Sequence, residues 1–404
     1  MTSSLKTPLE GIRVLDLGRY QAGPRCALMF ARMGAEVIKV ESIDGDESRK
    51  NGPTVRGQSA YWVQYNSGKK SLAINLRTEE GKEVIRDLVK VSDVFLQNFR
   101  PGTIEVMGFG YDALKKLNPR IIMINVSAYG QYGPLKDRVG FDPIGQAMGG
   151  MMSMTGFADG PPIRTNFPLI DRITSLHATI GALAALRERE ISGEGQAIDV
   201  CLADTGFTTN EIPISAYLGD GIVSERDGNG AGLGGMYKTT DGWVILAAGN
   251  DAMWKRICEA LDKPEWLEDP RYTTRADRSK NVEDLERELG EWFGVRTTGE
   301  AVDFLSNLSI PCAPVNDVAQ AANEPHLRER EIMMEVPDPV AGTMWVSGKM
   351  IKFSRTPMVV GSTPTVGQHN EELLKDVLGY SQDKIQALQD SEVIRRKEPA
   401  IASD

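Results

Sequence analysis

Short apolar runs alternate with helix-like stretches through the first 126 residues, and this alternation constrains the fold more than any other feature of the chain. The clearest unit, residues 12–41, has an apolar strand at 12–17, a helix from Pro24 to Met33 and a second strand at 34–40. Further strands are predicted at 71–76, 93–97 and 121–126, with a helix at 78–90. Such alternation predicts an α/β fold with a parallel sheet covered by helices.

The turn after the first strand, residues 18–24, reads Gly-Arg-Tyr-Gln-Ala-Gly-Pro. It lacks the GxGxxG spacing with which dinucleotide-binding domains wrap a pyrophosphate, and its side chains are too large for that close approach. The opening is therefore Rossmann-like in its order of elements, whereas an NAD-dependent enzyme is disfavoured.

The pattern divides the chain into four parts. Helices are predicted at 172–190 and 202–218, with a strand near 193–200 between them. We assign 1–205 to a large first domain, 206–235 to a linker helix and a glycine-rich loop, 236–325 to a small α+β domain, and 326–404 to a C-terminal part. We expect the small domain to contain a strand at 243–248, and the C-terminal part to hold a helix at 371–378 and to return to the first domain.

Residues 228–235 hold five glycines in eight positions, more than an ordinary turn requires. One interpretation is a mobile linker between domains, which is the usual role of such composition. The other is a lid, in which Gly232, Gly234 and Gly235 bring backbone amides over a reactive centre. Both interpretations remain open at this point.

Charge and composition disfavour several functional classes. The formal net charge of −10 argues against a general affinity for nucleic acid or for an anionic membrane. No apolar run approaches the roughly 18 residues that span a bilayer, and residues 1–7 lack a signal-peptide core, so we expect a cytoplasmic protein. The four cysteines form no CxxC pair and the three histidines are scattered, so we expect neither a metal site nor a histidine-based triad.

Asp171 is the only acidic residue between Asp159 and Glu188. Pro168 ends any preceding helix, and the apolar residues at 173, 176, 180 and 183 recur with helical spacing. Asp171 is therefore expected at a helix N-terminus, where the dipole and free amides favour the ionised carboxylate. It is either a capping residue or a nucleophile.

Several short motifs, all in one order along the chain, resemble the family III CoA-transferases, also called the CaiB/BaiF group, which include the formyl-CoA transferases. The motifs are LEGIRVLD at 9–16 with AGP at 22–24, GAEVIKVE at 34–41, NSGKKS at 66–71, NFRPG at 98–102, QAMGG at 146–150 with TG at 155–156 and GPP at 160–162, Asp171, and GEGQ at 193–196. The ordered set is far more specific than any one of its members.

The resemblance implies an activity and an architecture that periodicity alone does not indicate. Asp171 would be the catalytic carboxylate and would carry acyl and CoA groups in turn. Both chain ends would build a Rossmann-like large domain with a smaller domain between them, and two ring-shaped subunits would interlock as a homodimer. Coenzyme A, in the form of acyl-CoA, would be a substrate, and no metal would be required.

The resemblance also implies a set of CoA contacts. These are Gln21, Ala22, Tyr65, Asn66, Ser67, Gly68, Lys69, Asn98, Phe99 and Arg100, with Phe141 and Asp142 on the same face. Ser42 and Val106 stand where some members carry arginines against CoA phosphates, so those two roles are not transferred. The remaining cations are Lys69, Lys70, Arg100 and Arg138, and each is either a phosphate contact or a solvated surface charge.

A carboxylate suits this chemistry because its reference pKa of about 3.9 leaves it charged at neutral pH without a general base. The acids exchanged are less well specified, and succinyl-CoA is one candidate donor. Arg164 and Arg172 flank Asp171, and either they pair with the distal carboxylate of a dicarboxylic substrate such as succinate, or they face solvent or a CoA phosphate. The methionines at 148, 151, 152 and 154 form either an adaptable apolar wall or core filling.

Two rival functions remain open. An α-methylacyl-CoA racemase would share the fold and the CoA site, but it uses a His-Asp pair where this chain has Phe141-Asp142, so one acid–base partner is missing. The other rival is a non-catalytic subunit that supports an active paralogue, against which the presence of Asp171 argues. The sequence does not distinguish a homodimer from a heteromer with a paralogous subunit.

Overall fold

The structure is a computed structural model that describes residues 7–229, 234–248 and 250–397. Within these residues the chain forms two compact units, the first made of 7–151, 164–219 and 328–397, and the second of 152–163 and 220–327. Residues 152–163, which lie within the predicted first domain of 1–205, belong to the second unit, and the first unit continues past 205 to 219. The two chain ends therefore belong to one unit, and the middle of the chain makes the other.

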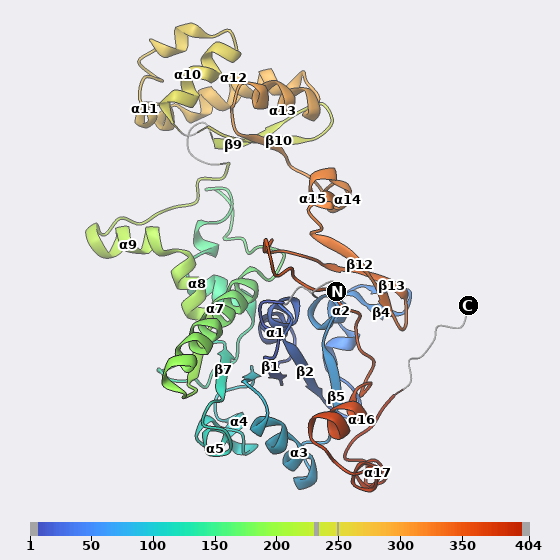
Figure 1. The fold of residues 1–404 in the computed structure, drawn as a ribbon. Coiled ribbons are helices and arrows are strands. Elements are labelled where there is room, and N and C mark those ends of the chain that lie inside the picture. Colours follow the sequence, from blue (N-terminus) through green and yellow to red (C-terminus); the bar gives the residue numbers. More distant parts are fainter. Residues whose placement is uncertain (1–6, 230–233, 249, 398–404) are drawn as a thin grey trace. The chain divides into compact units, whose positions relative to one another are not determined.

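The first unit is built on a six-stranded parallel sheet with strand order β5-β2-β1-β6-β7-β8. Figure 1 labels β5, β2, β1 and β7 of this sheet. The strands are β1 (Arg13–Asp16), β2 (Glu36–Glu41), β5 (Lys70–Ala73), β6 (Val94–Gln97), β7 (Ile122–Ser127) and β8 (Ala197–Cys201). In the register of this sheet, Val14 of β1 lies opposite Val37 of β2 on one side and Val94 of β6 on the other. The predicted α/β class and parallel sheet are thus confirmed.

Apolar residues cover both faces of this sheet because adjacent strand residues point to opposite sides. Val14 packs in a core with α1 and α7, whereas its neighbour Leu15 packs in a second core with α3 and α5. The helices of this unit are α1 (Ala22–Arg32), α2 (Ala60–Asn66), α3 (Glu79–Lys90), α4 (Thr103–Val106), α5 (Tyr111–Leu117), α6 (Asp142–Met148), α7 (Leu169–Ser192), α8 (Leu202–Thr209), α16 (Asn370–Glu372) and α17 (Gln382–Asp390), with α9 (Glu211–Asp220) at the boundary. Two-sided burial explains why these strands read as continuous apolar runs.

The helix predicted at 202–218 is two helices, α8 and α9, with a break at Asn210. Pro213 explains the break, because its ring would clash with the carbonyl of Thr209 in a continuous helix and it has no N–H to donate. α9 buries none of its side chains within the chain.

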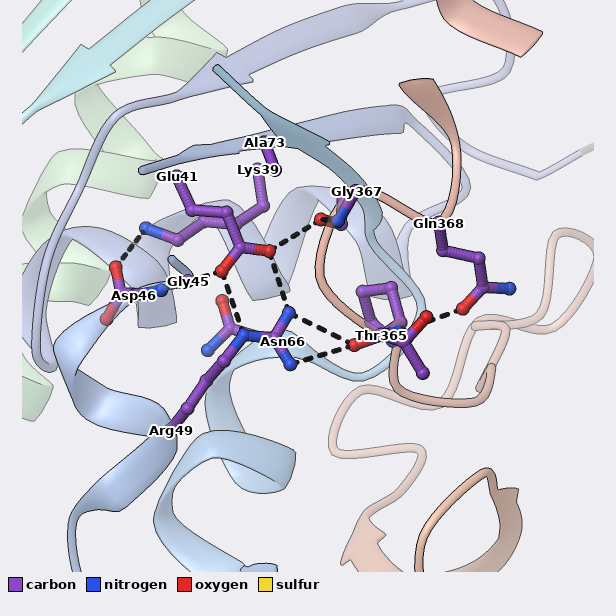
Figure 2. Close-up of polar contacts among 12 residues, drawn as sticks. Lys39, Glu41, Gly45, Asp46, Arg49, Asn66, Ala73, Thr365, Gly367 and Gln368 are labelled. Atoms are coloured by element: carbon purple, nitrogen blue, oxygen red, sulfur yellow. Dashed lines mark hydrogen bonds and ion pairs between the residues drawn. The ribbon is translucent and has the colours of Figure 1, made fainter. Parts of the chain in front are cut away.

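The C-terminal residues pack against the N-terminal part of the first unit at the edge strand β5. The Ala73 amide donates to Asn370 at 2.9 Å, and residues of α17 complete the core beneath α3. Figure 2 shows the polar contacts nearby: the Glu41 carboxylate accepts from Arg49 at 2.7 Å, and Arg49 also donates to the carbonyl of Pro364 at 3.2 Å. The remaining elements here are β3 (Thr54–Val55), β4 (Gln58–Ser59), the antiparallel pair β12 (Met333–Asp338) and β13 (Gly342–Ser347), the 3₁₀ turn η1 (Glu47–Lys50) and the π-helical turn η4 (Leu373–Val377).

The second unit has its own core around an antiparallel sheet of order β11-β10-β9. Trp254 and Trp266 stack in this core with their ring centroids 5.6 Å apart. Its elements are η2 (Met152–Met154), β9 (Gly234–Lys238), β10 (Trp243–Ala247), α10 (Asp251–Ala260), η3 (Pro264–Leu267), α11 (Arg275–Lys280), α12 (Val282–Gly294), α13 (Thr298–Asn307), β11 (Cys312–Pro314) and α14 (Val318–Asn323), and α15 (Pro325–Glu329) crosses the boundary.

Among the residues that the structure describes, one helix, α7, is long and apolar enough to cross a bilayer by length and composition alone. Part of its apolar surface is buried against α1 and the sheet, as in the core helix of a globular protein, and such helices meet the same criterion. The expected cytoplasmic location stays a prediction.

Candidate functional site

Asp171 lies in the first turn of α7, as the sequence predicts. Pro168 is the N-cap residue and offers no side-chain cap, and the Asp171 carboxylate makes no hydrogen bond or ion pair with any residue that the structure describes. The structure therefore gives no support to the interpretation of Asp171 as a simple cap. Its carboxylate is left available to react.

Asp142, the first residue of α6, holds the backbone of this turn. Its Oδ1 accepts a hydrogen bond of 2.9 Å from the Asp171 amide, and its Oδ2 accepts one of 2.5 Å from Gln146, one turn further along α6. Gln146 in turn accepts from the backbone amide of Thr165 and donates to its hydroxyl, each at 3.0 Å. The chain entering α7 is therefore fixed to α6 through buried polar groups.

The protonation of Asp171 differs from the sequence expectation. Burial, and then the nearby Asp142 carboxylate, raise the pKa of Asp171 to about 7. The helix N-terminus was expected to favour the ionised form, but loss of solvation and a like charge outweigh the dipole here. Asp171 is therefore poised to gain or lose its proton near neutral pH.

A pocket of about 470 Å³ opens at the carboxyl ends of β1, β6 and β7, with Asp171 in its wall. It brings together eight of the predicted residues: Gln21, Ala22, Asn98, Phe99, Arg100, Arg138, Phe141 and Asp171. Arg19, Tyr20 and Ser127 also line it and were not predicted. Their position directly after parallel strands is the signal that finds them, because ligands of open α/β sheets bind beyond the carboxyl ends of the strands.

Three arginines line this pocket, and Arg19 is paired with Glu47, which leaves Arg100 and Arg138. Both side chains are exposed, and neither forms an ion pair with a residue that the structure describes. Lys70, by contrast, is held by Glu36 and Glu372, each at 2.6 Å.

The predicted contacts from Tyr65 to Lys69 do not line this pocket. The Lys69 ammonium is fully buried and donates to Asp16 at 2.7 Å, to the Pro24 carbonyl at 2.9 Å and to Asn66 at 3.1 Å. All three of its N–H groups have protein partners, so Lys69 acts in this structure as an internal ion pair. Ser67 is also buried and accepts from Arg32 at 2.7 Å.

The predicted substrate residues lie in different settings. Arg172 follows Asp171 on α7 and is half-buried, whereas Arg164 is exposed. Gly234 and Gly235 were predicted to lie in a loop. They are instead residues of strand β9, because the pairing with β10 extends to them: Gly234 pairs with Ala247 and Gly235 with Leu246. Gly232 lies outside the described residues. The methionines at 148, 151, 152 and 154 belong to none of the buried cores of the described residues.

A second pocket, of about 660 Å³, lies at the carboxyl ends of β2 and β5 and was not predicted. Its wall is acidic, with Glu41, Asp44, Asp46 and Glu47, and Arg77 is among its cations. Lys39 neutralises Asp46 at 2.9 Å, as Figure 2 shows.

Comparisons with known proteins identify the family of this chain. The sequence matches the family described as CoA-transferase family III over residues 9–370. It is 36% identical to a succinyl-CoA–D-citramalate CoA-transferase of Chloroflexus aurantiacus, covering 96% of this chain and 98% of that protein. It is also 36% identical to the beta subunit of a succinyl-CoA–L-malate CoA-transferase of the same organism, with the same coverage. A CAIB/BAIF family protein from Brucella suis has a similar structure, with a TM-score of 0.83 and 31% identity over 92% of this chain and all of that one.

Proposed function

Because the chain belongs to CoA-transferase family III, we propose that Asp171 is the nucleophile through which it moves coenzyme A from an acyl-CoA thioester to a free carboxylic acid. One observation carries the proposal. The Asp171 carboxylate has no protein partner among the described residues and faces a pocket large enough for a ligand chain. A structural carboxylate in this position would be paired or hydrogen-bonded.

The reaction needs no other protein group to form or break a covalent bond. A carboxylate oxygen of Asp171 attacks the thioester carbonyl, the C–S bond breaks, and a mixed anhydride and CoA thiolate form. The thiolate then attacks the aspartyl carbonyl, the anhydride C–O bond breaks, and the donor acid leaves as its carboxylate. The acceptor acid reverses these steps on the resulting aspartyl-CoA thioester, so no net proton is transferred.

The raised pKa of Asp171 serves this chemistry. Burial and Asp142 leave the carboxylate poorly solvated, with a pKa of about 7. A poorly solvated carboxylate loses less solvation when it attacks, and a more basic oxygen is a stronger nucleophile. About half of the molecules carry the reactive ionised form near pH 7.

The CoA contacts are proposals of the same kind. Gln21, Ala22 and the residues at 98–100 would line the path of the pantetheine chain toward Asp171. The unpaired guanidiniums of Arg100 and Arg138 would bind CoA phosphates, because guanidinium groups match phosphate oxygens. Lys69 is not part of this proposal, since its ammonium is already bonded within the protein.

The assembly is proposed from unburied apolar faces. α9 exposes Ile212, Tyr217 and Leu218, and α7 exposes Ile180 and Ile191. Apolar faces of this kind usually lie in interfaces. We therefore propose that the Rossmann-like unit made from both chain ends associates as an interlocked homodimer. A heteromer is the alternative, because one relative is named as a beta subunit.

Trapping the covalent intermediate tests the proposed function. The purified chain is incubated with a panel of acyl-CoA donors, succinyl-CoA among them, and quenched with borohydride or hydroxylamine. Mass spectrometry should find the modification on the peptide that contains Asp171, and the Asp171→Asn variant should show neither modification nor transfer. An Asp171→Asn variant with parental turnover would overturn the proposal. Deuterium incorporation at the α-carbon of a 2-methylacyl-CoA would instead favour a racemase.

The glycine-rich lid is a separate proposal, in which Gly234 and Gly235 would act from the start of strand β9. The anhydride and the aspartyl-CoA thioester both hydrolyse if water reaches them, so a transferase benefits from a cover. Gly234→Ala is the cleaner test, since an added Cβ would meet only the Leu246 carbonyl at 3.7 Å, whereas at Gly235 it would meet Asn229 at 2.9 Å. If this segment is a lid, the Gly234→Ala protein should hydrolyse more acyl-CoA relative to the CoA that it transfers. An unchanged ratio of hydrolysis to transfer would reject the proposal.

A further inference from the structure

Three helices of the first unit bring two arginines and two tyrosines together beside Asp171. Arg25 lies in the first turn of α1, Arg172 in the first turns of α7, and Tyr61 and Tyr65 on α2. The two tyrosine rings meet edge to face with centroids 5.0 Å apart. Arg25 and Arg172 each interact electrostatically with Tyr65, and Asp171 does so with both tyrosines. The four side chains therefore form one cluster that adjoins the nucleophile.

Neither guanidinium has an acidic partner. Arg25 makes no side-chain hydrogen bond or ion pair with any residue that the structure describes, and no carboxylate pairs with Arg172 in the same part of the chain. The Nε atoms of both are buried without a hydrogen-bond partner. The guanidinium carbon of Arg172 lies 5.4 Å from the centre of the Phe167 ring, and its charge acts on the Tyr65 hydroxyl.

Other enclosed cations of this chain are bonded to protein oxygens. Lys39 pairs with Asp46 at 2.9 Å, Lys69 with Asp16 at 2.7 Å and Arg189 with Asp93 at 2.8 Å. Arg25 departs from this pattern, and Arg172 is hydrogen-bonded to the neutral Tyr65 hydroxyl and not to a carboxylate. The two guanidiniums also repel one another: burial, and then Arg172, lower the pKa of Arg25. Departures from local pairing rules are expected where a protein binds a ligand.

Asp171 is not the missing counterion. Its pKa is raised by burial and by Asp142, and neither arginine opposes that rise. A salt bridge from Arg172 would have lowered that pKa and weakened the nucleophile. The two guanidiniums therefore lie near the reacting carboxylate without pairing with it.

With CoA transfer at Asp171 as its premise, we propose that Arg25 and Arg172, together with the Tyr65 hydroxyl, bind the distal carboxylate of a dicarboxylic substrate while its other carboxyl group reacts at Asp171. Guanidinium groups bind carboxylates through two parallel hydrogen bonds, and a phenol adds a third donor. Arg172 directly follows Asp171, so the site favours a short diacid. Succinyl-CoA is the donor in the names of two similar proteins.

The test compares two acids of equal length. Succinyl-CoA and butyryl-CoA differ in a terminal carboxylate against a methyl group, and succinate and butyrate serve as the matching acceptors. Arg25→Gln and Arg172→Gln should each lower kcat/KM for the succinyl substrates by about 10- to 100-fold and leave the butyryl substrates within about twofold, as loss of a hydrogen bond between charged groups predicts. Arg187→Gln is the control, because Arg187 is an exposed arginine of α7 paired with Glu190.

A binding measurement keeps the inference testable apart from catalysis. Succinate should raise the thermal unfolding midpoint of the parent, butyrate at the same concentration should not, and the Arg25→Gln variant should lose the response. Because Arg25→Gln removes a like-charge repulsion, its own midpoint without ligand should not fall.

The outcomes separate the two proposals. Equal losses for succinyl and butyryl substrates would assign the arginines to a CoA phosphate, which every donor carries, and would overturn the inference. Unchanged selectivity, or a succinate response that survives in Arg25→Gln, would also overturn it. If the parent transferred CoA from no donor while succinate still stabilised it through Arg25, the proposed function would fail and the carboxylate site would stand.

Discussion

The backbone amide of Asp171 donates a hydrogen bond of 2.9 Å to the carboxylate of Asp142. One acidic side chain therefore positions the turn that carries the other, and its charge makes the neighbouring carboxylate harder to ionise. Gln146 holds the second Asp142 oxygen, so this carboxylate has little freedom to turn away.

Removing the charge of Asp142 should shift the acid limb of the plot of kcat/KM against pH toward lower pH. In Asp142→Asn the amide oxygen can still accept from the Asp171 amide, but the like charge is gone, so the pKa of Asp171 should fall below about 7. At pH 6 the ionised fraction would rise about fivefold if the pKa fell from about 7 by one unit. The measurement is kcat/KM between pH 5 and 9, normalised to the plateau of each protein. An unmoved acid limb would mean that burial alone sets this pKa.

Asp171 should also make stability depend on pH. Its pKa is about 7 in the folded chain and 3.8 as the ordinary value for an aspartate, so between these values the folded state holds a proton that the unfolded state has lost. Stability from this group is therefore lost as pH rises from about 4 to 7. Asp171→Asn should raise the free energy of unfolding at pH 8 by about 1 to 4 kcal/mol, because each pKa unit is worth about 1.4 kcal/mol, and the gain should vanish near pH 4.

Urea unfolding of the parent and Asp171→Asn at pH 4.5 and pH 8 measures this difference. Asp159→Asn is the matched control, because that carboxylate is exposed. Its stability should differ from that of the parent by the same small amount at pH 4.5 and at pH 8. A gain of the same size at both pH values would contradict the proposed protonation of Asp171.

The internal ion pair of Lys69 and Asp16 should be important for stability. Both side chains are fully buried, and the ammonium bonds two further oxygens. Lys69→Met should cost about 3 to 5 kcal/mol because it leaves a buried carboxylate unpaired. Lys90→Met removes the exposed pair with Asp87 and should cost less than about 0.5 kcal/mol.

A double variant separates the pair from its surroundings. Asp16→Asn keeps an oxygen that can accept from the Gly18 amide, so the Asp16→Asn/Lys69→Met protein should be more stable than Lys69→Met alone. Chemical denaturation of the parent, the two single variants and the double variant measures the coupling energy between Asp16 and Lys69. Additive losses would show that the two charges do not depend on one another.

The parallel sheet could be predicted because its local signals agree. Strands β1, β2, β6 and β7 are buried on both faces, so each stands in the sequence as an apolar run between helix-like segments. The break at Asn210 was missed, although Pro213 marks it, because the apolar pattern continues across it. Gly234 and Gly235 were assigned to a loop, since composition does not show that β10 provides pairing partners for them.

The site was predictable only in part. Asp171 stands out in the sequence because no other acid is near it, and its place on α7 follows from Pro168. Its raised pKa depends on burial in the folded chain and then on Asp142, which is 29 positions away in sequence, so no local pattern reveals it. Arg25 was missed for a similar reason: within the helix of 22–32 it looks like a surface residue, and only the approach of α7 and α2 encloses it.

The crossing of α6 and α8 should set the position of Asp142. A Cβ at Gly206 of α8 would lie 2.1 Å from the carbonyl oxygen of Gly145 on α6, so the two backbones are in direct contact there. Gly206→Ala must push α6 away and should lower the free energy of unfolding by about 1 to 3 kcal/mol, as overpacking does. It should also lower kcat more than it raises KM, because Asp142 would move with α6. Gly290→Ala is the control, since that helical glycine has nothing within 4 Å, and alanine there should stabilise by up to about 1 kcal/mol. A Gly206→Ala protein with parental stability and kcat would show that α6 can shift without disturbing Asp171.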